Sequence, residues 1–353
     1  MKPVSELRQD LVSGDWVVIA TGRARRPREF SKEKRSAFVQ PKSSCPFETL
    51  HKNVLVVYSL DGEYQKSRRK VGTPAFSSKV SYGASGENWW VEVVPNKYPA
   101  FGRGRCQIVR RAGLYSLSDS VGFHEVVVTR DHERSIALMN QEEVELVLRS
   151  YQDRFLALKD ESCVEYISVF HNHGREAGAT LTHPHSQIIA IPVIPPDVAR
   201  SLKGSAQYLH TYQLCVHCRI LAYELKVGDR IIYQNKRFAV LAPFASKTAF
   251  EIRVYPKYHE ARFENISPED RFLLADALRT ALAKLFEGLS NPDYNFFLHT
   301  APVRNSKEFN HYHWHIEILP KTAIWAGFEI GTGIEISTIA PEKAAAFLRK
   351  IKI

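Results

Sequence analysis

The chain has 353 residues, a hydrophobic fraction of 44%, a charged fraction of 24% and a formal net charge of +10. These fractions are typical of a soluble globular protein with one to three domains. No run approaches the ~20 apolar residues that a membrane-spanning helix needs, which excludes a transmembrane protein. The positive charge favours an anionic partner. Because the basic residues are spread through loops, nucleic acid is less favoured than a phosphorylated small molecule.

The amino terminus does not begin a signal peptide, so we expect a cytoplasmic protein. The chain has five cysteines, an odd number that argues against a disulfide framework. Cys106 and Cys163 lie beside apolar residues and are interpreted as ordinary buried thiols. Cys45, Cys215 and Cys218 belong to short motifs of a different kind.

The first half of the chain is predicted to combine strands with one long helix. Runs rich in β-branched and aromatic residues predict strands at residues 16–20, 89–94, 125–129 and 165–170. Asn140 and Glu143 have the spacing of a capping box, which predicts a helix that starts after Asn140. Its apolar stripe is interpreted as core and consists of Val144, Val147, Leu148, Tyr151 and Phe155.

The most informative stretch is residues 172–190, which contains two imidazoles two positions apart, His183 and His185. Residues i and i+2 of an extended segment face the same side, so both rings can enter one site. A neutral imidazole is a metal ligand or a nucleophile, and Pro184 fixes the backbone between the two rings.

The neighbours of these histidines fit an anionic ligand. Gly174 and Gly178 allow the backbone to approach a bulky anion closely. Ser186 and Gln187 are neutral side chains that could donate to phosphate oxygens. A surface loop is the competing interpretation, which the two histidines around a proline make the weaker one.

The second half of the chain repeats the order of these features. Strands are predicted at residues 238–243, 251–255 and 294–299, and a connecting segment at 193–212. Ser267 followed by Pro268 predicts a second long helix, and His313 and His315 align with His183 and His185. The shared order predicts an α+β fold of two like-folded halves, residues 1–192 and 193–353, each an antiparallel sheet with one long helix.

Four residues of the second half form a candidate zinc site. Cys215 and Cys218 are close in sequence, while His259 and His313 are remote. Zinc prefers such a tetrahedral set of two sulfur and two nitrogen ligands. A Cys-x-x-Cys pair also suits redox chemistry, but no thioredoxin-like context follows it.

The pattern Asn172-x-Gly-x-x-x-Gly, followed by His183-Pro-His-x-Gln, resembles the active-site segment of galactose-1-phosphate uridylyltransferases, which belong to the histidine-triad superfamily. The resemblance implies a two-module fold, a homodimer and a covalent mechanism. In that mechanism His185 attacks the α-phosphorus of a nucleotide sugar and passes the nucleotide to a sugar 1-phosphate or another phosphate acceptor. Nucleotide sugars and sugar 1-phosphates are therefore the expected ligands.

The resemblance also implies roles in substrate binding. Arg23 and Arg26 match phosphate contacts, Asn96 and Tyr98 match the nucleoside site, and Phe328 and Glu329 match contacts to the distal sugar. Plain packing is the alternative for Tyr98, and a strand-end acid the alternative for Glu329. Lys97 stands where the family often has an aspartate that contacts ribose, which leaves the base open. The remaining matches to phosphate contacts are Asn172, Gly178, Thr180 and Gln187.

The resemblance implies a metal in each half. The first-half zinc set would be Cys45, Glu48, His132 and His183. Because Glu48 replaces the usual second cysteine, this site is either a Cys-Glu-His-His site or a weakened one. Some relatives bind iron through three histidines and a glutamate, for which His299, His313 and His315 are the candidates. His313 would serve both arrangements, so we expect them to exclude each other, and the cysteine pair favours zinc.

The function implied is the exchange of UMP between UDP-glucose and galactose 1-phosphate through a uridylyl-histidine. The first alternative is an ADP-sugar phosphorylase or adenylyltransferase of the same family, which the Lys97 replacement keeps open. The second is a zinc-stabilised nucleic-acid-binding protein that uses the positive charge. No groove-reading helix or aromatic RNA platform supports this second alternative.

Overall fold

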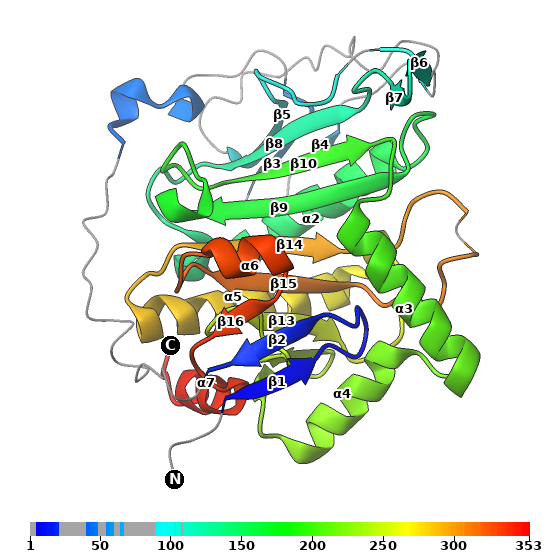
Figure 1. Cartoon of the computed structure of the whole chain (residues 1–353). Coiled ribbons are helices and arrows are strands. Elements are labelled where there is room, and N and C mark those ends of the chain that lie inside the picture. The colour runs from blue at the N-terminus through cyan, green and yellow to red at the C-terminus, as the bar shows by residue number, and fades with distance from the viewer. Residues whose placement is uncertain are drawn as a thin grey trace.

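The computed structural model describes residues 5–20, 40–48, 54–59, 64–66, 89–102, 104–106, 109–305 and 307–353. Within this part, one antiparallel sheet of eleven strands runs through the molecule in the order β11-β12-β13-β15-β14-β9-β10-β8-β5-β3-β4 (Figure 1). Its strands are β3 (Val56–Ser59), β4 (Tyr64–Lys66), β5 (Trp89–Pro95), β8 (Phe123–Thr129), β9 (Tyr166–His173), β10 (His185–Ile191), β11 (Ile231–Gln234), β12 (Phe238–Leu241), β13 (Ile252–Pro256), β14 (Tyr294–His299) and β15 (His315–Pro320).

Each half of this sheet carries one long helix on the same face, α2 (Gln141–Leu158) and α5 (Pro268–Leu289). Asn140 and Glu143 form the predicted capping box, and the Ser267 side chain accepts from the backbone N–H of Asp270. The predicted stripe of α2 is buried in one core with leucines of α5 and alternate residues of the strands. The α+β fold of two like-folded halves is therefore confirmed.

The two halves share one hydrogen-bonded sheet, because β9 of the first pairs with β14 of the second. In the register of this pair Asn172 lies opposite Asn295 and His171 opposite Phe296. The alternation of a strand then sends Asn172 and Asn295 to the face of the sheet that does not carry α2 and α5. Side chains of both halves therefore meet on this second face, the open face of the sheet.

Two helices connect the halves where the sequence predicted a connecting segment. α3 (Pro196–Tyr212) starts with a proline, and α4 (Val216–Val227) follows Cys215 as its N-cap. Val198 and Leu202 are buried beside Tyr312. The cysteine pair at the start of α4 lies near His313, which directly precedes β15.

Residues from both ends of the chain cover the second half. β1 (Glu6–Gln9) and β2 (Trp16–Ile19) form a small sheet with β16 (Glu335–Ser337), which lies in front of the large sheet (Figure 1). Arg8 binds Glu342 of α7 (Pro341–Arg349) with an Nη1–Oε1 distance of 2.9 Å, and Arg230 binds the same carboxylate at 2.7 Å. The amino-terminal strands, which belong to residues 1–192, thus pack on the second half.

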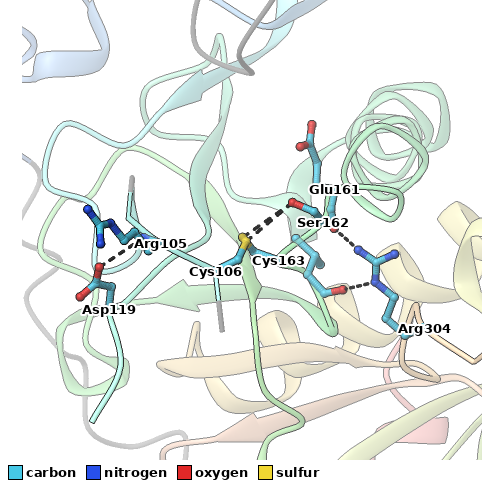
Figure 2. Close-up of a disulfide and its surroundings, with 8 residues drawn as sticks. Arg105, Cys106, Asp119, Glu161, Ser162, Cys163 and Arg304 are labelled. Atoms are coloured by element: carbon cyan, nitrogen blue, oxygen red, sulfur yellow. Dashed lines mark hydrogen bonds between the residues drawn. A yellow bond between two sulfur atoms is a disulfide. The ribbon is translucent and has the colours of Figure 1, made fainter. Parts of the chain in front are cut away.

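The expectation for two cysteines is wrong. Cys106 and Cys163 form a disulfide with a Cα–Cα distance of 5.4 Å, and Ser162 lies beside both sulfurs (Figure 2). The bridge ties the segment after β5 to the turn before β9, while Arg304 donates to the backbone carbonyl of Val164 next to it. The two cysteines are 57 positions apart in the sequence, so only the folded chain brings them together.

Two smaller elements complete the description. β6 (Arg110–Ala112) and β7 (Tyr115–Leu117) form an exposed hairpin, and α6 (Gly327–Thr332) lies in front of β14 and β15 (Figure 1).

Among the described helices, none combines the length and the apolarity that crossing a bilayer requires.

Candidate active site

The imidazole of His185 lies at the start of β10 on the open face. Its Nδ1 is 2.8 Å from the carbonyl oxygen of His183, which can only accept, so Nδ1 carries the proton. Nε2 then has the free lone pair, and it has no hydrogen-bond partner among the described residues. Burial lowers the pKa of His185, which keeps the ring neutral near pH 7. The ring is therefore held in the state that a nucleophile needs.

The loop before His185 lets the backbone come close to a ligand. Gly174 and Gly178 have φ values of 82° and 86°, which side-chain-bearing residues rarely adopt. A Cβ on Gly174 would lie 2.2 Å from the Asp293 carboxyl carbon, so only glycine fits there. A Cβ on Gly178 would lie 4.0 Å from Nδ2 of Asn172, while Thr180 is exposed in the same loop. Of the predicted phosphate residues in this loop, Gly178 is thus placed beside Asn172.

Gln187 follows His185 on the same face of β10 and contacts a histidine that the sequence did not single out. Oε1 of Gln187 is 2.7 Å from Nε2 of His124 on β8. Nδ2 of Asn96 is 3.1 Å from the same nitrogen, and Oδ1 of Asn96 accepts the backbone N–H of Tyr98. The nucleoside candidate Asn96 and the phosphate candidate Gln187 therefore meet at His124.

Ser186 does not take part in this face, contrary to expectation. Its hydroxyl is buried beneath the sheet, 2.5 Å from the Tyr151 hydroxyl and 3.1 Å from Nδ1 of His171. Neighbouring strand residues point to opposite faces, so Ser186 must face α2 when His185 and Gln187 face outward. Ser186 joins the sheet to α2 and cannot reach a phosphate bound beside His185.

The first predicted metal set is assembled beside His185. Nδ1 of His132 and Nδ1 of His183 are 3.2 Å apart, and Sγ of Cys45 is 3.6 Å from the latter. Both Nε2 atoms face backbone carbonyls, of Gln40 at 2.6 Å and of Thr129 at 2.6 Å. The Nε2 protons therefore point outward and two lone pairs converge, which is the donor arrangement of a metal site.

Glu48 lies beside the two histidines of this first cluster, whose mutually close ligand atoms are those of Cys45, His132 and His183. Its Oε1 lies 2.9 Å from Nδ1 of His132 and 3.4 Å from Nδ1 of His183. The intervening Phe47 packs against both His183 and His185, with ring centroids 5.6 and 5.2 Å away. Two nitrogens, a thiol and a carboxylate fit zinc, and the motif that supplies the last two also contacts the nucleophile.

The second predicted metal set is also assembled. Sγ of Cys218 lies 3.5 Å from Nδ1 of His313 and 3.6 Å from Nδ1 of His259, with Cys215 in the same group. The two Nε2 atoms face the backbone carbonyls of Asn310 and Pro256. A hydrogen bond from Cys218 lowers the pKa of the Cys215 thiol, which favours the thiolate that zinc binds. This set fits a tetrahedral Cys2His2 site.

A third cluster of possible metal ligands forms in the second half without His313. His299 and His315 are grouped with Glu317, whose Oε1 is 3.3 Å from Nε2 of His315. His313 points to the cysteines and takes no part in this cluster. The two arrangements expected to exclude each other therefore do not compete for one residue. The third cluster lines a cavity of about 740 Å³ whose wall also includes Phe170 and Asn172 of the first half.

The remaining substrate candidates are placed differently. Arg23 and Arg26 lie outside the described residues. Tyr98 is 79% exposed, so it does not serve core packing. Phe328 and Glu329 belong to α6 on the second half, where Glu329 accepts the backbone N–H of Ala326 at 3.1 Å. Within the described part of the chain, no hydrogen bond, ion pair or ring contact joins either of these two residues to His185.

Sequence reasoning missed His124 and Asn295. Nδ2 of Asn295 donates to Oδ1 of Asn172 at 2.8 Å and to the carbonyl of Ala177 at 2.7 Å. Neither residue lies in a recognisable motif, since each reaches the site through strand pairing. Alternation along β8 and β14 was the one available signal, because it places both residues on the open face.

Fold and relatives together define a nucleotidyltransferase of the histidine-triad superfamily, in which the duplicated sheet is the frame. The family model described as the N-terminal domain of galactose-1-phosphate uridyl transferase matches residues 88–195. ADP-glucose phosphorylase of Arabidopsis thaliana is 31% identical to this chain and the match covers 99% of the chain and 93% of the relative. The chain belongs to the galactose-1-phosphate uridylyltransferase family.

Other relatives agree with this assignment. Galactose-1-phosphate uridylyltransferase of Thermotoga maritima is 28% identical over 73% of this chain and 83% of that protein. The crystal structure of ADP-glucose phosphorylase from Arabidopsis thaliana with bound ADP-glucose has a TM-score of 0.76 at 26% identity, covering 99% of this chain and all of that one. A uridylyltransferase structure has a TM-score of 0.70 at 26% identity, covering 98% and 97%. The likeness therefore extends over both halves.

Proposed function

We propose that the protein is an ADP-sugar phosphorylase that transfers AMP from ADP-glucose to inorganic phosphate through a covalent bond to His185. The observation that carries the proposal is the His185 ring, whose Nδ1 is tied to the His183 carbonyl while Nε2 is open. The choice of adenosine and phosphate is supported by the full-length likeness to a protein named ADP-glucose phosphorylase. It replaces UMP exchange as the first candidate.

The reaction has two displacements at the α-phosphorus. In the first, the Nε2 lone pair of His185 forms a bond to phosphorus, the bond to the bridging oxygen breaks, and glucose 1-phosphate leaves. In the second, an oxygen of inorganic phosphate attacks the same phosphorus, the P–N bond breaks, and ADP leaves. The ring gains positive charge in the intermediate, and the Nδ1–H bond to the His183 carbonyl stabilises that charge.

Each other residue of the site has a role that its contacts support. The amides of Asn172 and Gln187 donate to the α-phosphoryl oxygens as charge develops there, and each such donor contributes about 10²- to 10³-fold to a rate. Asn96 and the exposed Tyr98 are near enough to His124 and Gln187 to hold the nucleoside. The glycines of the preceding loop allow a bulky pyrophosphate to reach the strand end.

We propose zinc for the Cys45, Glu48, His132 and His183 cluster and for the Cys215, Cys218, His259 and His313 cluster. When bound, zinc would supply positioning and structural rigidity. In the first cluster the chain's own residues hold His183 by its Nε2–H bond to Thr129, and Thr129 also donates to the Pro184 carbonyl at 3.2 Å. These bonds fix the backbone that presents the His185 ring.

Exchange of UMP between UDP-glucose and galactose 1-phosphate is the second candidate. The matched family model and the Thermotoga maritima relative, which is named a galactose-1-phosphate uridylyltransferase, favour it. Both candidates use the same bond to His185 and differ in the base and in the acceptor. The donor and acceptor therefore separate them.

The test supplies purified protein with ADP-glucose or UDP-glucose, each labelled in the α-phosphate, and follows transfer to phosphate or to galactose 1-phosphate. We expect ADP from ADP-glucose and phosphate as the fastest reaction. Rapid acid-free quenching and peptide mass spectrometry should locate AMP on His185. A faster transfer of UMP to galactose 1-phosphate would select the second candidate. Turnover without any labelled histidine would refute the covalent mechanism.

A further inference from the structure

Three amides near His185, those of Asn172, Asn96 and Gln187, have an oxygen that faces a partner within the protein. Oδ1 of Asn172 accepts from Asn295, and Oδ1 of Asn96 accepts from a backbone N–H. Oε1 of Gln187 faces His124. An amide whose oxygen is already bonded turns its NH2 group the other way, and NH2 can only donate. The groups that donate to these amide oxygens therefore orient the NH2 groups, which are the donors available to a ligand.

The tautomer of His124 follows from its partners. The backbone N–H of Ala100 lies 3.1 Å from Nδ1 and can only donate, so Nδ1 carries the lone pair. The proton of the neutral ring is then on Nε2, and its acceptor is Oε1 of Gln187 at 2.7 Å. Nδ2 of Asn96, at 3.1 Å from the same Nε2, cannot donate to a protonated nitrogen and keeps its hydrogens for another acceptor.

The orientation of Asn295 is fixed in a similar way. Its Nδ2 reaches two acceptors, the backbone carbonyl of Ala177 at 2.7 Å and Oδ1 of Asn172 at 2.8 Å. Because a backbone carbonyl is an acceptor in every state, the amide of Asn295 must direct its nitrogen there. Asn172 then has its oxygen occupied and its NH2 group near Gly178.

We propose that His124 and Asn295 are positioning residues that fix the NH2 groups of Gln187 and Asn172 toward the phosphoryl oxygens of the ligand. The inference rests on the proposed function, since it names how that site selects its substrate. A free amide beside an anion can rotate and present its oxygen, which repels the anion. Fixing its direction before the ligand binds removes that reorganisation from the reaction.

The same arrangement of N–H donors favours one chemical class of ligand. Fixed N–H donors without a paired acceptor favour groups that only accept, such as phosphate and pyrophosphate oxygens. No described residue accepts a hydrogen bond from Nε2 of Gln187, which agrees with a donor reserved for the ligand. His124 also ties the phosphate side to the nucleoside side, because its backbone oxygen accepts the N–H of Asn96 at 2.8 Å.

The first test is a double-mutant cycle on the whole protein with His124→Phe and Gln187→Leu, using the donor and acceptor that the wild type turns over fastest. We expect kcat/KM to fall about 100-fold for Gln187→Leu and about tenfold for His124→Phe. The double variant should match Gln187→Leu alone, because His124 acts through that amide. Multiplying losses, or a His124→Phe variant with wild-type kcat/KM, would overturn the inference. His124→Gln, which keeps a side-chain N–H donor, should recover part of the loss.

The second test uses Asn295→Asp, a substitution of nearly equal size that cannot donate. Asn172 should then turn its NH2 group toward residue 295 and its oxygen toward the ligand, so kcat/KM falls about 100-fold. In an Asn172→Ala background the same substitution should change kcat/KM less than about threefold. An undiminished loss in that background would mean that the new charge acts directly on the ligand, which would overturn the role of Asn295.

Failure of the proposed function has a different signature. If wild-type protein never forms a nucleotidyl-histidine, the proposed chemistry fails, and the affinity for ADP still tests the amides. Calorimetry of ADP binding to His185→Gln protein, with and without His124→Phe, needs no turnover. We expect about tenfold weaker binding with His124→Phe, and equal binding would refute the positioning role. Circular dichroism and thermal melts of every variant establish that the fold is retained.

Discussion

The two halves place an imidazole at matching points of one sheet, yet they treat its reactive nitrogen differently. Nδ1 of His185 and of His315 is 2.8 and 3.1 Å from the carbonyl two residues earlier. Nε2 of His185 is open, whereas Nε2 of His315 is 3.3 Å from Glu317. Glu317 occupies the position that corresponds to Gln187, two residues after the ring. The difference between the two rings is thus that Nε2 of His315 faces a carboxylate, whereas the residue at the matching position in the first half is an amide.

The surroundings reinforce this difference. Arg253 binds Glu317 at 3.0 Å and Asp10 at 3.2 Å, and all three are part of the cavity wall. Glu317 also faces His315, so an anionic donor at that ring would meet a carboxylate. Both halves nevertheless keep a cluster of Cys and His residues. If His185 is the nucleophile, as proposed, the comparison assigns the clusters to the frame and the choice of the reacting ring to the residue two positions after it.

The largest expected effect separates the two rings. His185→Gln should lower kcat by about 10⁴-fold or more, because removal of a nucleophile abolishes the covalent route. His315→Gln should leave kcat within about threefold, since that ring faces Glu317. Steady-state rates of the two variants, measured side by side, check this. A loss of similar size in both would contradict the division of labour.

The next largest effect on kcat/KM is expected when the residues two positions after each ring, Gln187 and Glu317, are exchanged. Gln187→Glu gives the first half the carboxylate of the second and should lower kcat/KM about 100-fold by repelling the anionic donor and removing an N–H donor. Glu317→Gln is the matched variant, for which we expect kcat/KM within about threefold of wild type. Initial rates at subsaturating donor measure both. An unchanged Gln187→Glu enzyme would argue against a role for amide polarity.

Removal of metal ligands should separate activity from stability. Cys45→Ser should lower the metal content by about one ion and kcat by about tenfold, because His183 and the backbone of His185 lose an anchor. Cys218→Ser should lose one ion and mainly lower the melting temperature, because its cluster joins α4 to β13 and β15. Elemental analysis, rates and thermal melts give the three readouts. Wild-type protein purified without either zinc or iron would remove the basis for both expectations.

The smallest effect compares the helix caps. Asn140→Ala and Ser267→Ala should each lower the free energy of unfolding by about 1 kcal/mol. The two losses should be alike, since each substitution removes one hydrogen bond, while the backbone N–H of residue 140 still donates to Glu143. Urea denaturation of both variants measures the two values. A difference above about 0.5 kcal/mol would show that one cap contributes more than its own hydrogen bond.

Much of the frame could be predicted from the sequence because its signals are local. The strands and the caps at Asn140 and Ser267 follow from alternation, apolar stripes and capping residues that lie within a few positions of one another. The two metal sets could be aligned because the second half repeats the first. The helical form of residues 196–212 was not predicted, since α3 is amphipathic over a segment that was interpreted as a connection.

The parts that could not be predicted depend on pairing between distant strands. His124 reaches Gln187 through the pairing of β8 with β10, and Asn295 reaches Asn172 through the pairing of β9 with β14. The direction of Ser186 and the union of Cys106 with Cys163 have the same origin. A single sequence carries no register between such segments, so their contacts appear only when the chain is folded.

The pairing of β9 with β14 determines what would happen if the chain were cut into its two halves. Severed between β10 and α3, either fragment would expose a row of unpaired backbone groups along the strand that had been central. A second copy of the same fragment could bind there and restore an uninterrupted sheet, at the cost of replacing Asn295 opposite Asn172. Fragment assembly would thus regain the architecture and still lack the partner that orients the amide.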